Sequence, residues 1–509
     1  MNKQSRKKMA GLLMLTLVST TLAAGCSSGN GASGSSPNAS NAPSESQTPS
    51  TQPNKPISIR TMQPYWSSAL PDTSSPLFKK MEQIMNAQIT ADFVQGSSFM
   101  DKVNVTLASG DLPDILVVLQ GNQPSIIQAI RAGAFWEVGK YVDKFPNLKA
   151  SRSKISDDAI QVDGKIWALY KPMDLDRGGI NMRQDWLDKL GLKRPRTMDE
   201  LYNVLKAFAQ NDPDGNGKQD TYGLASSGLP LWFFAEKFGA PNGYKVEGGK
   251  FVPAFATEEY RNAMRFFRKL YTEGIMNKDF AYAKLSQTDE ILVNGQAGAY
   301  FGNVDRADLW AKVMNNNANA KLLSFSDMDG PNLNYANTGY YTTMMFPKGT
   351  VKTEERLLEL LGALDRLAAP ENADFRVYGI EGTDYKVENG KKTIINNQWP
   401  VLASLTALAA TKPEVPLDGH PDWHVEMYKI VAENGKSKTL TPNPSAGLVS
   451  QTRNEKGNEL QKLIDDAVTK YVMNELDDKG FDDAIQKWRS TGGDQMLKEY
   501  EAEHQKLKR

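Results

Sequence analysis

The sequence predicts an α/β protein built on a parallel β-sheet with helices on both faces. Three strand-like segments alternate with two helix-like segments within about 65 residues, as in consecutive βαβ units. The third strand-like segment, Ile115–Leu119, is apolar throughout, which is typical of a strand buried on both faces. Hydrophobic residues make up 40% of the 509 residues, enough for a large core. Sheets of this kind bind ligands at the carboxyl ends of their strands.

The first five elements follow from apolar spacing and from the breaks between segments. In the first helix, Leu77, Met81, Ile84 and Met85 recur at helical spacing on one face. Gly110 ends the second helix. The predicted elements are strands over Ile57–Met62, Gln88–Val94 and Ile115–Leu119 and helices over Leu77–Ala87 and Phe99–Ser109.

The later part of the chain is richer in helix. Thr197 with Glu200 forms a capping box that opens a helix reaching about Gln210. Thr257 opens another helix, which Gly274 closes. Further segments are predicted as helices over Lys352–Leu367 and Asn458–Leu476 and as strands over Ala297–Phe301 and Tyr340–Phe346.

Charge and cysteine content exclude several classes of protein. The chain has 60 Lys and Arg against 60 Asp and Glu, without the basic excess of a nucleic-acid-binding protein. One Cys excludes a disulfide framework and any multi-cysteine metal site. With three His in the whole chain, a histidine-rich zinc site is disfavoured.

The amino terminus has the features of an export signal. A basic stretch ending at Lys8 precedes an apolar segment, Met9–Leu22, of signal-peptide length. The single Cys, Cys26, follows small residues at the end of that segment, an arrangement that resembles a bacterial lipobox. The resemblance implies a signal peptide over 1–25 and a lipidated Cys26. The alternative is an ordinary secretory signal cut near Ala24.

A polar segment follows Cys26. Ser27–Lys55 contains no Leu, Ile, Val or aromatic residue and is rich in Ser, Gly, Asn, Pro and Thr. This composition predicts a flexible tether with a typical reach on the order of 30 Å.

Ordered motifs along the chain resemble those of extracellular solute-binding lipoproteins of carbohydrate ABC transporters, in the large oligosaccharide-binding branch. The clearest is Leu107–Ile115, which reads ASGDLPDI after its first residue. The other motifs are Gly133–Val138, Asp163–Leu169, Met182–Gly191, Asn294–Tyr300 and Phe481–Tyr500. They occur in the order that the family shows.

The resemblance implies a two-lobed, periplasmic-binding-protein-like fold with a hinge and a cleft between the lobes. Lobe 1 would hold residues 56–170 and about 337–375, and lobe 2 would hold about 171–336 and 376–509. It also implies a monomer on the extracellular face of the membrane of a bacterium of Gram-positive type, held by its lipid anchor alone. Its partners would be an oligosaccharide and an ABC transporter permease, with no nucleic acid.

A loop rich in Asp, Asn and Gly predicts a calcium site. Side-chain oxygens at its first, third, fifth and ninth positions and a backbone carbonyl at its seventh can surround one cation. A glycine fills the twelfth position, where an EF-hand carries Glu, and the alternative is a polar turn. The candidate ligands are Asp212, Asp214, Asn216, Lys218 and Asp220.

Aromatic residues beside amides and carboxylates are candidates for the cleft. Sugars present C–H faces and hydroxyl rims, which flat aromatic rings and polar neighbours can match. Core packing is the alternative for any one Trp. The candidates are Trp66, Asp114, Trp232, Asn303, Asp305, Trp310, Tyr340 and Trp399, with Tyr341 next to Tyr340.

Two functions of different classes fit these patterns. The first is a binding protein that captures an oligosaccharide without chemistry and delivers it to an importer or, in a variant, to a sensor. The second is a membrane-tethered carbohydrate-active enzyme, a glycosidase or lyase. His420 and His424 do not form a metalloprotease motif, because no Glu follows the first His. No catalytic residues are therefore assigned.

Overall fold

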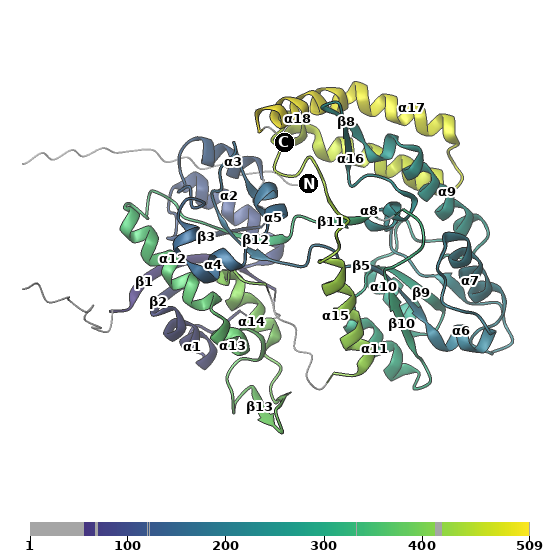
Figure 1. Cartoon of the computed structure of the whole chain (residues 1–509), viewed down its shortest axis with the longest axis horizontal. Helices are drawn as coiled ribbons and strands as arrows, with labels where there is room; N and C mark the ends of the chain where they lie inside the picture. Colours follow the sequence, from purple (N-terminus) through teal and green to yellow (C-terminus); the bar gives the residue numbers. More distant parts are fainter. Residues whose placement is uncertain are drawn as a thin grey trace, which may run out of the picture. The chain divides into compact units, whose positions relative to one another are not determined.

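The computed structural model describes residues 55–66, 70–119, 121, 123–331, 333–412 and 420–507, except the side chains of Trp399 and Pro400. Buried apolar side chains of the Lys55–Arg509 unit gather into two main cores, each built around its own sheet. The prediction of the α/β class is confirmed (Figure 1).

The first sheet has the strand order β2-β1-β3-β12-β4. The predicted parallel pairing of the first three strands is confirmed, while β12 runs antiparallel to both β3 and β4. All five residues of β3 are buried, so both faces of the sheet are covered. Its strands are β1 (Ile57–Tyr65), β2 (Ala87–Gln95), β3 (Ile115–Leu119), β4 (Leu169–Pro172) and β12 (Tyr340–Met345).

Helices cover this sheet from two sides, with α2, α3 and α5 on one and α1, α12, α13 and α14 on the other (Figure 1). The first helix ends at Met85, earlier than predicted, because Asn86 adopts the left-handed conformation that closes helices and Ala87 then begins β2. The helices of this core are α1 (Pro76–Met85), α2 (Phe99–Ser109), α3 (Pro124–Arg131), α4 (Pro146–Ala150), α5 (Lys154–Ile160), α12 (Glu354–Ala368), α13 (Ala373–Tyr378) and α14 (Trp399–Leu405).

The second sheet has the order β10-β5-β9-β6, with β5 antiparallel to both neighbours and β6 parallel to β9. Its strands are β5 (Gly178–Arg183), β6 (Tyr222–Leu224), β9 (Ala297–Asn303) and β10 (Leu322–Phe325). Two hairpins lie outside the sheets, β7 (Tyr244–Glu247) with β8 (Lys250–Pro253) and β13 (Tyr385–Glu388) with β14 (Lys391–Ile394).

Helices of different lengths build the second core and its surroundings. The predicted capping box of Thr197 and Glu200 is confirmed at the start of α7. The helix predicted from Asn458 begins earlier, at Gln451, because the Ser450 hydroxyl caps it by accepting the Arg453 amide. These helices are α6 (Gln184–Leu190), α7 (Met198–Gln210), α8 (Leu231–Phe234), α9 (Glu258–Thr272), α10 (Leu285–Val293), α11 (Ala307–Asn316), α15 (Asp422–Asn434), α16 (Gln451–Val472), α17 (Asp478–Trp488) and α18 (Asp494–Lys506).

The chain passes between the two sheets several times. Residues 173–177 connect β4 to β5, and β11 (Asn334–Ala336) precedes β12. A later segment contributes β15 (Leu440–Pro442), which pairs in parallel with β11. Leu402, Leu405 and Leu408 lie in the first core, so residues 376–408 do not begin the second lobe as predicted, since their apolar side chains pack on the first sheet's helices.

Candidate ligand-binding site

Two aromatic side chains occupy the carboxyl edge of the first sheet. Trp66 directly follows β1, and Tyr341 lies at the start of β12, which begins at this edge because it runs antiparallel to β3. Their ring centroids are 6.1 Å apart and their planes are tilted by 49°. The side chains are 44% and 46% exposed. Their faces can therefore stack on an apolar surface of a ligand.

Tyr340 differs from its neighbour. Successive residues of a strand point to opposite faces, so exposure of Tyr341 places Tyr340 inward. Tyr340 is buried, and its ring lies 5.8 Å from that of Tyr170. It contributes to the wall of the adjacent cavity, but its ring is not available as a stacking platform.

A cavity of about 550 Å³ opens beside this edge. The first core contributes Gln123, Gln161 and Tyr341 to its wall, and α16 contributes Arg453 and Asn458. Side-chain amides and a guanidinium can donate hydrogen bonds to ligand oxygens, and the amides can also accept them.

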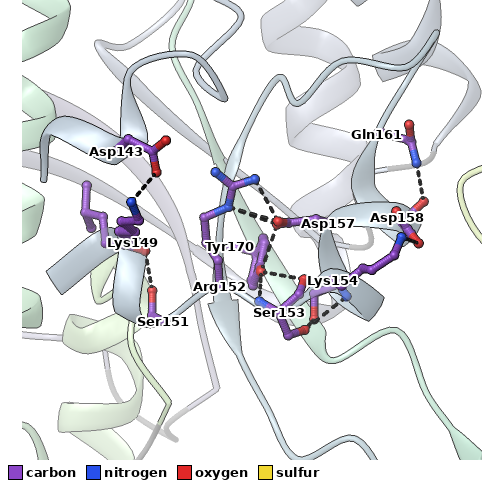
Figure 2. Close-up of polar contacts among 12 residues, drawn as sticks. Asp143, Lys149, Ser151, Arg152, Ser153, Lys154, Asp157, Asp158, Gln161 and Tyr170 are labelled. Carbon is purple, nitrogen blue, oxygen red and sulfur yellow. Dashed lines mark hydrogen bonds and ion pairs between the residues drawn. The ribbon is translucent and has the colours of Figure 1, made fainter. Parts of the chain in front are cut away.

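A polar network fixes the helix that carries Gln161 to this wall (Figure 2). The Arg152 guanidinium donates to both carboxylate oxygens of Asp157 in α5, at 2.7–3.1 Å. The Tyr170 hydroxyl donates to the same carboxylate at 3.0 Å and accepts the Ser153 amide at 2.9 Å. The Gln161 amide donates to the carbonyl of Asp158 at 3.2 Å. The network therefore holds α5 and this wall in place.

A larger cavity, of about 840 Å³, adjoins the first on the side of the second core. Arg453 and Asn458 line both cavities, so the two cavities adjoin at α16. Trp232, on α8, is 56% exposed and lines the larger cavity. Its other lining residues include Tyr244, Tyr260, Tyr335, Trp488, Asn443, Gln461 and Asp465.

The phenols of the larger cavity keep their protons. Burial raises the pKa values of Tyr244, Tyr260 and Tyr335 above the usual range for tyrosine. Each hydroxyl is therefore neutral at physiological pH. The Tyr335 hydroxyl already donates to the Ala240 carbonyl at 2.6 Å, which fixes its ring in the wall.

Two predicted residues of the second core lie at the end of β9. Asn303 is the last residue of the strand, and Asp305 follows it. Both Asp305 oxygens accept from the Arg177 guanidinium at 2.9–3.2 Å. Arg177 belongs to the connection between the sheets, so this ion pair ties that connection to the second core. Neither residue lines the two cavities described above.

Trp310 and Asp114, both predicted as ligand contacts, lie away from the two cavities. Trp310 is 1% exposed, because α11 turns its apolar face, with Ala307 and Val313, into a small core. Asp114 precedes β3 at the edge opposite to Trp66, where it accepts the Arg60 amide at 2.9 Å and an Arg356 N–H at 3.3 Å. The Trp399 side chain lies outside the described residues.

Comparison with known proteins decides the family. A model of bacterial extracellular solute-binding proteins matches residues 65–371, which is more than half of the chain. The chain belongs to this family. The resemblance to extracellular solute-binding proteins that the sequence motifs indicated is therefore confirmed.

Individual members resemble this solute-binding protein over most of its length. Lipoprotein LipO of Bacillus subtilis is 34% identical over 484 residues, which cover 91% of this chain and 96% of LipO. The polygalacturonan/rhamnogalacturonan-binding protein YtcQ of the same bacterium is 35% identical over 434 residues, covering 83% and 86%. A structure of Streptococcus pneumoniae FusA with kestose has a TM-score of 0.62 at 19% identity and covers 89% of this chain and 99% of FusA. This coverage spans both cores and confirms the two-lobed fold.

The class of activity follows from the family. The matching family is one of solute-binding proteins, YtcQ is named as a binding protein, and FusA is named as the substrate-binding protein of an ABC transporter. The prediction of a solute-binding protein rather than a glycosidase or lyase is therefore confirmed. In the described ranges, no helix is long and apolar enough to cross a bilayer. Cys26 lies outside the described residues.

The α16 contribution to the site was missed in the sequence prediction. Arg453 lies before the predicted start of this helix at Asn458, and Asn458, Gln461 and Asp465 lie within the predicted helix but were not recognised as lining a cavity. Ser450, placed three residues before Arg453, is the cap signal that could have located this helix end.

The predicted calcium loop lies between α7 and β6 of this solute-binding protein. Its oxygens are engaged within the loop. Asp212 accepts the Gly215 and Gly217 amides at 3.0 Å, while the Asn216 side-chain amide donates to Asp214 at 2.8 Å and to Asp220 at 3.1 Å. Among the residues placed by the structure, no three acidic, histidine or cysteine side chains are arranged to hold one metal ion.

The three carboxylates of the loop lie close together, so added positive charge would stabilise them. Burial, the hydrogen bond with Asp212 and the charge of Asp220 raise the pKa of Asp214. The Asn216 amide group stands between two of the three carboxylates and supplies only partial positive charge. Lys218 contributes its amide, which donates to the Asn216 side-chain oxygen at 2.8 Å.

Proposed function

We propose that this solute-binding protein captures an oligosaccharide in its two adjoining cavities and delivers it, as a monomer, to an ABC import permease. The observation that carries the proposal is that the two cavities share Arg453 and Asn458 in their walls, with an exposed aromatic ring, Tyr341 or Trp232, lining each cavity. A chain of sugar rings can stack on Trp66, Tyr341 and Trp232 while its hydroxyls meet the amides between them.

The names of the relatives support this ligand class. YtcQ is named for polygalacturonan and rhamnogalacturonan, and FusA is named for fructooligosaccharides. The combined space of about 840 and 550 Å³ exceeds what a single sugar ring fills and suits several linked rings.

A thermal-shift screen tests the proposal. The panel holds fructooligosaccharides including kestose, oligogalacturonates, rhamnogalacturonan fragments and the corresponding monosaccharides. A ligand that binds only the folded protein raises its melting temperature. We expect at least one oligosaccharide to do so, and its monosaccharide to have little effect. A panel without any response, or a shift produced equally by the monosaccharides, would contradict the proposal.

We further propose that Cys26 carries the lipid that anchors this protein to the outer face of the cell membrane. The support is the lipobox-like sequence ending at Cys26 and the name of the relative LipO. Both B. subtilis relatives point to a Gram-positive type of envelope. The tether of residues 27–55 would let the folded part move about 30 Å from the membrane.

Cys26→Ser should change the location of the protein, because a serine hydroxyl cannot form the thioether of the lipid anchor. We expect the wild-type chain in the membrane fraction and the variant either released or retained with an uncut signal. Fractionation, with mass measurement of the amino terminus, checks this. Cleaved variant protein that fractionates with membranes as the wild type does would exclude the anchor.

We also propose that the 212–220 loop binds calcium with a structural role. Asp212, Asp214, Asn216 and Asp220 would give side-chain oxygens and Lys218 a backbone carbonyl, after the Asn216 amide turns its oxygen inward. The support is the raised pKa of Asp214 among neighbouring carboxylates. A structure of FusA is described as that of an EF-hand mutant, so that relative has such a loop.

A further inference from the structure

A buried ion pair lies where the chain passes between the two sheets. Glu236 and Lys237 belong to the short 3-10 helix η3 (Ala235–Phe238) of the second core. Glu236 is 1% exposed, and its carboxylate lies 2.7 Å from the Lys237 ammonium. The other carboxylate oxygen accepts the backbone N–H of Tyr335, in β11, at 2.5 Å. Glu236 thus joins the second core to a connecting strand.

A second buried carboxylate lies in the neighbouring connection. Asp176, between β4 and β5, accepts the Gly178 amide at 2.7 Å and the Asn334 side-chain amide at 3.2 Å. The Asn334 side-chain oxygen accepts the hydroxyls of Ser437 and Thr439 at 3.0 and 2.9 Å. Three connecting segments therefore meet at this cluster.

The cluster carries two carboxylates and one ammonium. The charged groups that face Glu236 are Lys237 on its own helix and Asp176 from the first connection. β11 adds the neutral Asn334 and the Tyr335 phenol, and α9 adds the Tyr260 phenol beside Tyr335. Burial, opposed by Lys237 and reinforced by Asp176, raises the pKa of Glu236 to about 7. Burial also raises the pKa of Asp176.

The same strand reaches the ligand site. Tyr335 lines the 840 Å³ cavity, and its hydroxyl is fixed to the Ala240 carbonyl. Four residues after Tyr335, Gly339 has a φ of +71°, and β12 then carries Tyr341 to the rim of the first sheet. A change in how Glu236 holds the Tyr335 amide therefore acts on the wall of one cavity and on the approach to the other.

We propose that Glu236 is a proton-sensitive positioning residue of the segments that connect the two sheets, which holds β11 and Tyr335 against the second core when protonated and loosens them when ionised. The neutral carboxyl group still accepts the Tyr335 amide, whereas the buried carboxylate lies near Asp176 and gains hydration when β11 opens. The link to ligand binding rests on the proposed function, because it takes the Tyr335-lined cavity as the site.

Amide hydrogen exchange of the whole chain without sugar tests this between pH 5.5 and 8.5, after correction for intrinsic exchange. We expect protection of the Asn334–Ala336 segment to fall as the pH rises, by roughly tenfold, because a Glu236 pKa that is higher in the closed state than in the open state makes the closed state lose stability on ionisation. Protection of Ile115–Leu119, in the first core, serves as the internal reference and should stay level.

Two variants identify the titrating group. Glu236→Gln keeps the shape and an acceptor for the Tyr335 amide but cannot ionise, so the pH-dependent fall should disappear. Asp176→Asn removes the nearby negative charge, so the midpoint of the fall should move to lower pH. Glu359→Gln, an exposed carboxylate on α12, should behave as the wild type.

Protection that stays level or rises with pH in the wild-type chain, or the same fall in Glu236→Gln, would overturn the proposal. If Glu236→Gln does not fold, an unchanged midpoint in Asp176→Asn would overturn it as well. No sugar is present in these measurements. A negative hydrogen-exchange result therefore does not contradict the proposed oligosaccharide binding. A negative sugar screen likewise does not contradict the proposed role of Glu236.

Discussion

Replacing Trp232 with alanine should weaken binding of the cognate oligosaccharide roughly ten- to hundredfold. The ring is 56% exposed at the wall of the larger cavity, so a stacked sugar would remove much of it from water. Burial of one large apolar side chain contributes about 1.5–3 kcal/mol, which corresponds to that change in Kd. Titration calorimetry with the sugar found in the screen measures the effect.

Matched variants separate stacking from a general loss of stability. Trp232→Phe keeps a flat ring and should retain part of the affinity. Trp66→Ala and Tyr341→Ala should each weaken binding at the other end of the site. Val105→Ala removes an exposed apolar side chain from α2 that lines neither cavity and should bind as the wild type does. Unchanged affinity in all three aromatic variants would rule out this site.

Removing calcium should lower the melting temperature by several degrees while leaving sugar affinity nearly unchanged where the fold survives. An ion that binds only the folded state stabilises it by about 2.7 kcal/mol at a hundredfold excess over its Kd. The loop lies between α7 and β6 and is not part of either cavity wall. Differential scanning calorimetry with calcium and with chelator measures the shift.

Asp214→Ala should abolish the response to chelator, because Asp214 is the carboxylate most affected by its acidic neighbours. Asp466→Ala, which changes an exposed carboxylate paired with Lys462 on α16, should respond as the wild type does. A melting temperature that ignores both calcium and chelator would show that the loop is a polar turn stabilised by the Asn216 amide.

Local patterns predicted the elements of the first sheet well. Ile115–Leu119 was found because five consecutive apolar residues need burial on both faces, and the capping box of Thr197 and Glu200 marked α7. Trp66 was placed at the ligand edge by a topological rule, since the carboxyl ends of parallel strands share one edge.

The site itself depended on packing that local patterns do not contain. Trp310 follows polar residues in the sequence, yet the rotation of α11 turns it into a core. Tyr340 and Tyr341 are adjacent and chemically alike, and the register of β12 alone decides which ring is exposed. No sequence pattern singled out Glu236, because its proposed role depends on contacts with Tyr335 and Asp176, which are distant in the sequence.

The most direct test of the central claim is calorimetric titration of the wild-type protein with its oligosaccharide, followed by analysis of the recovered sugar. A protein that captures one oligosaccharide in the adjoining cavities should bind with a stoichiometry of one and return the sugar with its length unchanged. Absence of binding by every oligosaccharide in the panel, or recovery of a shortened sugar, would contradict the account.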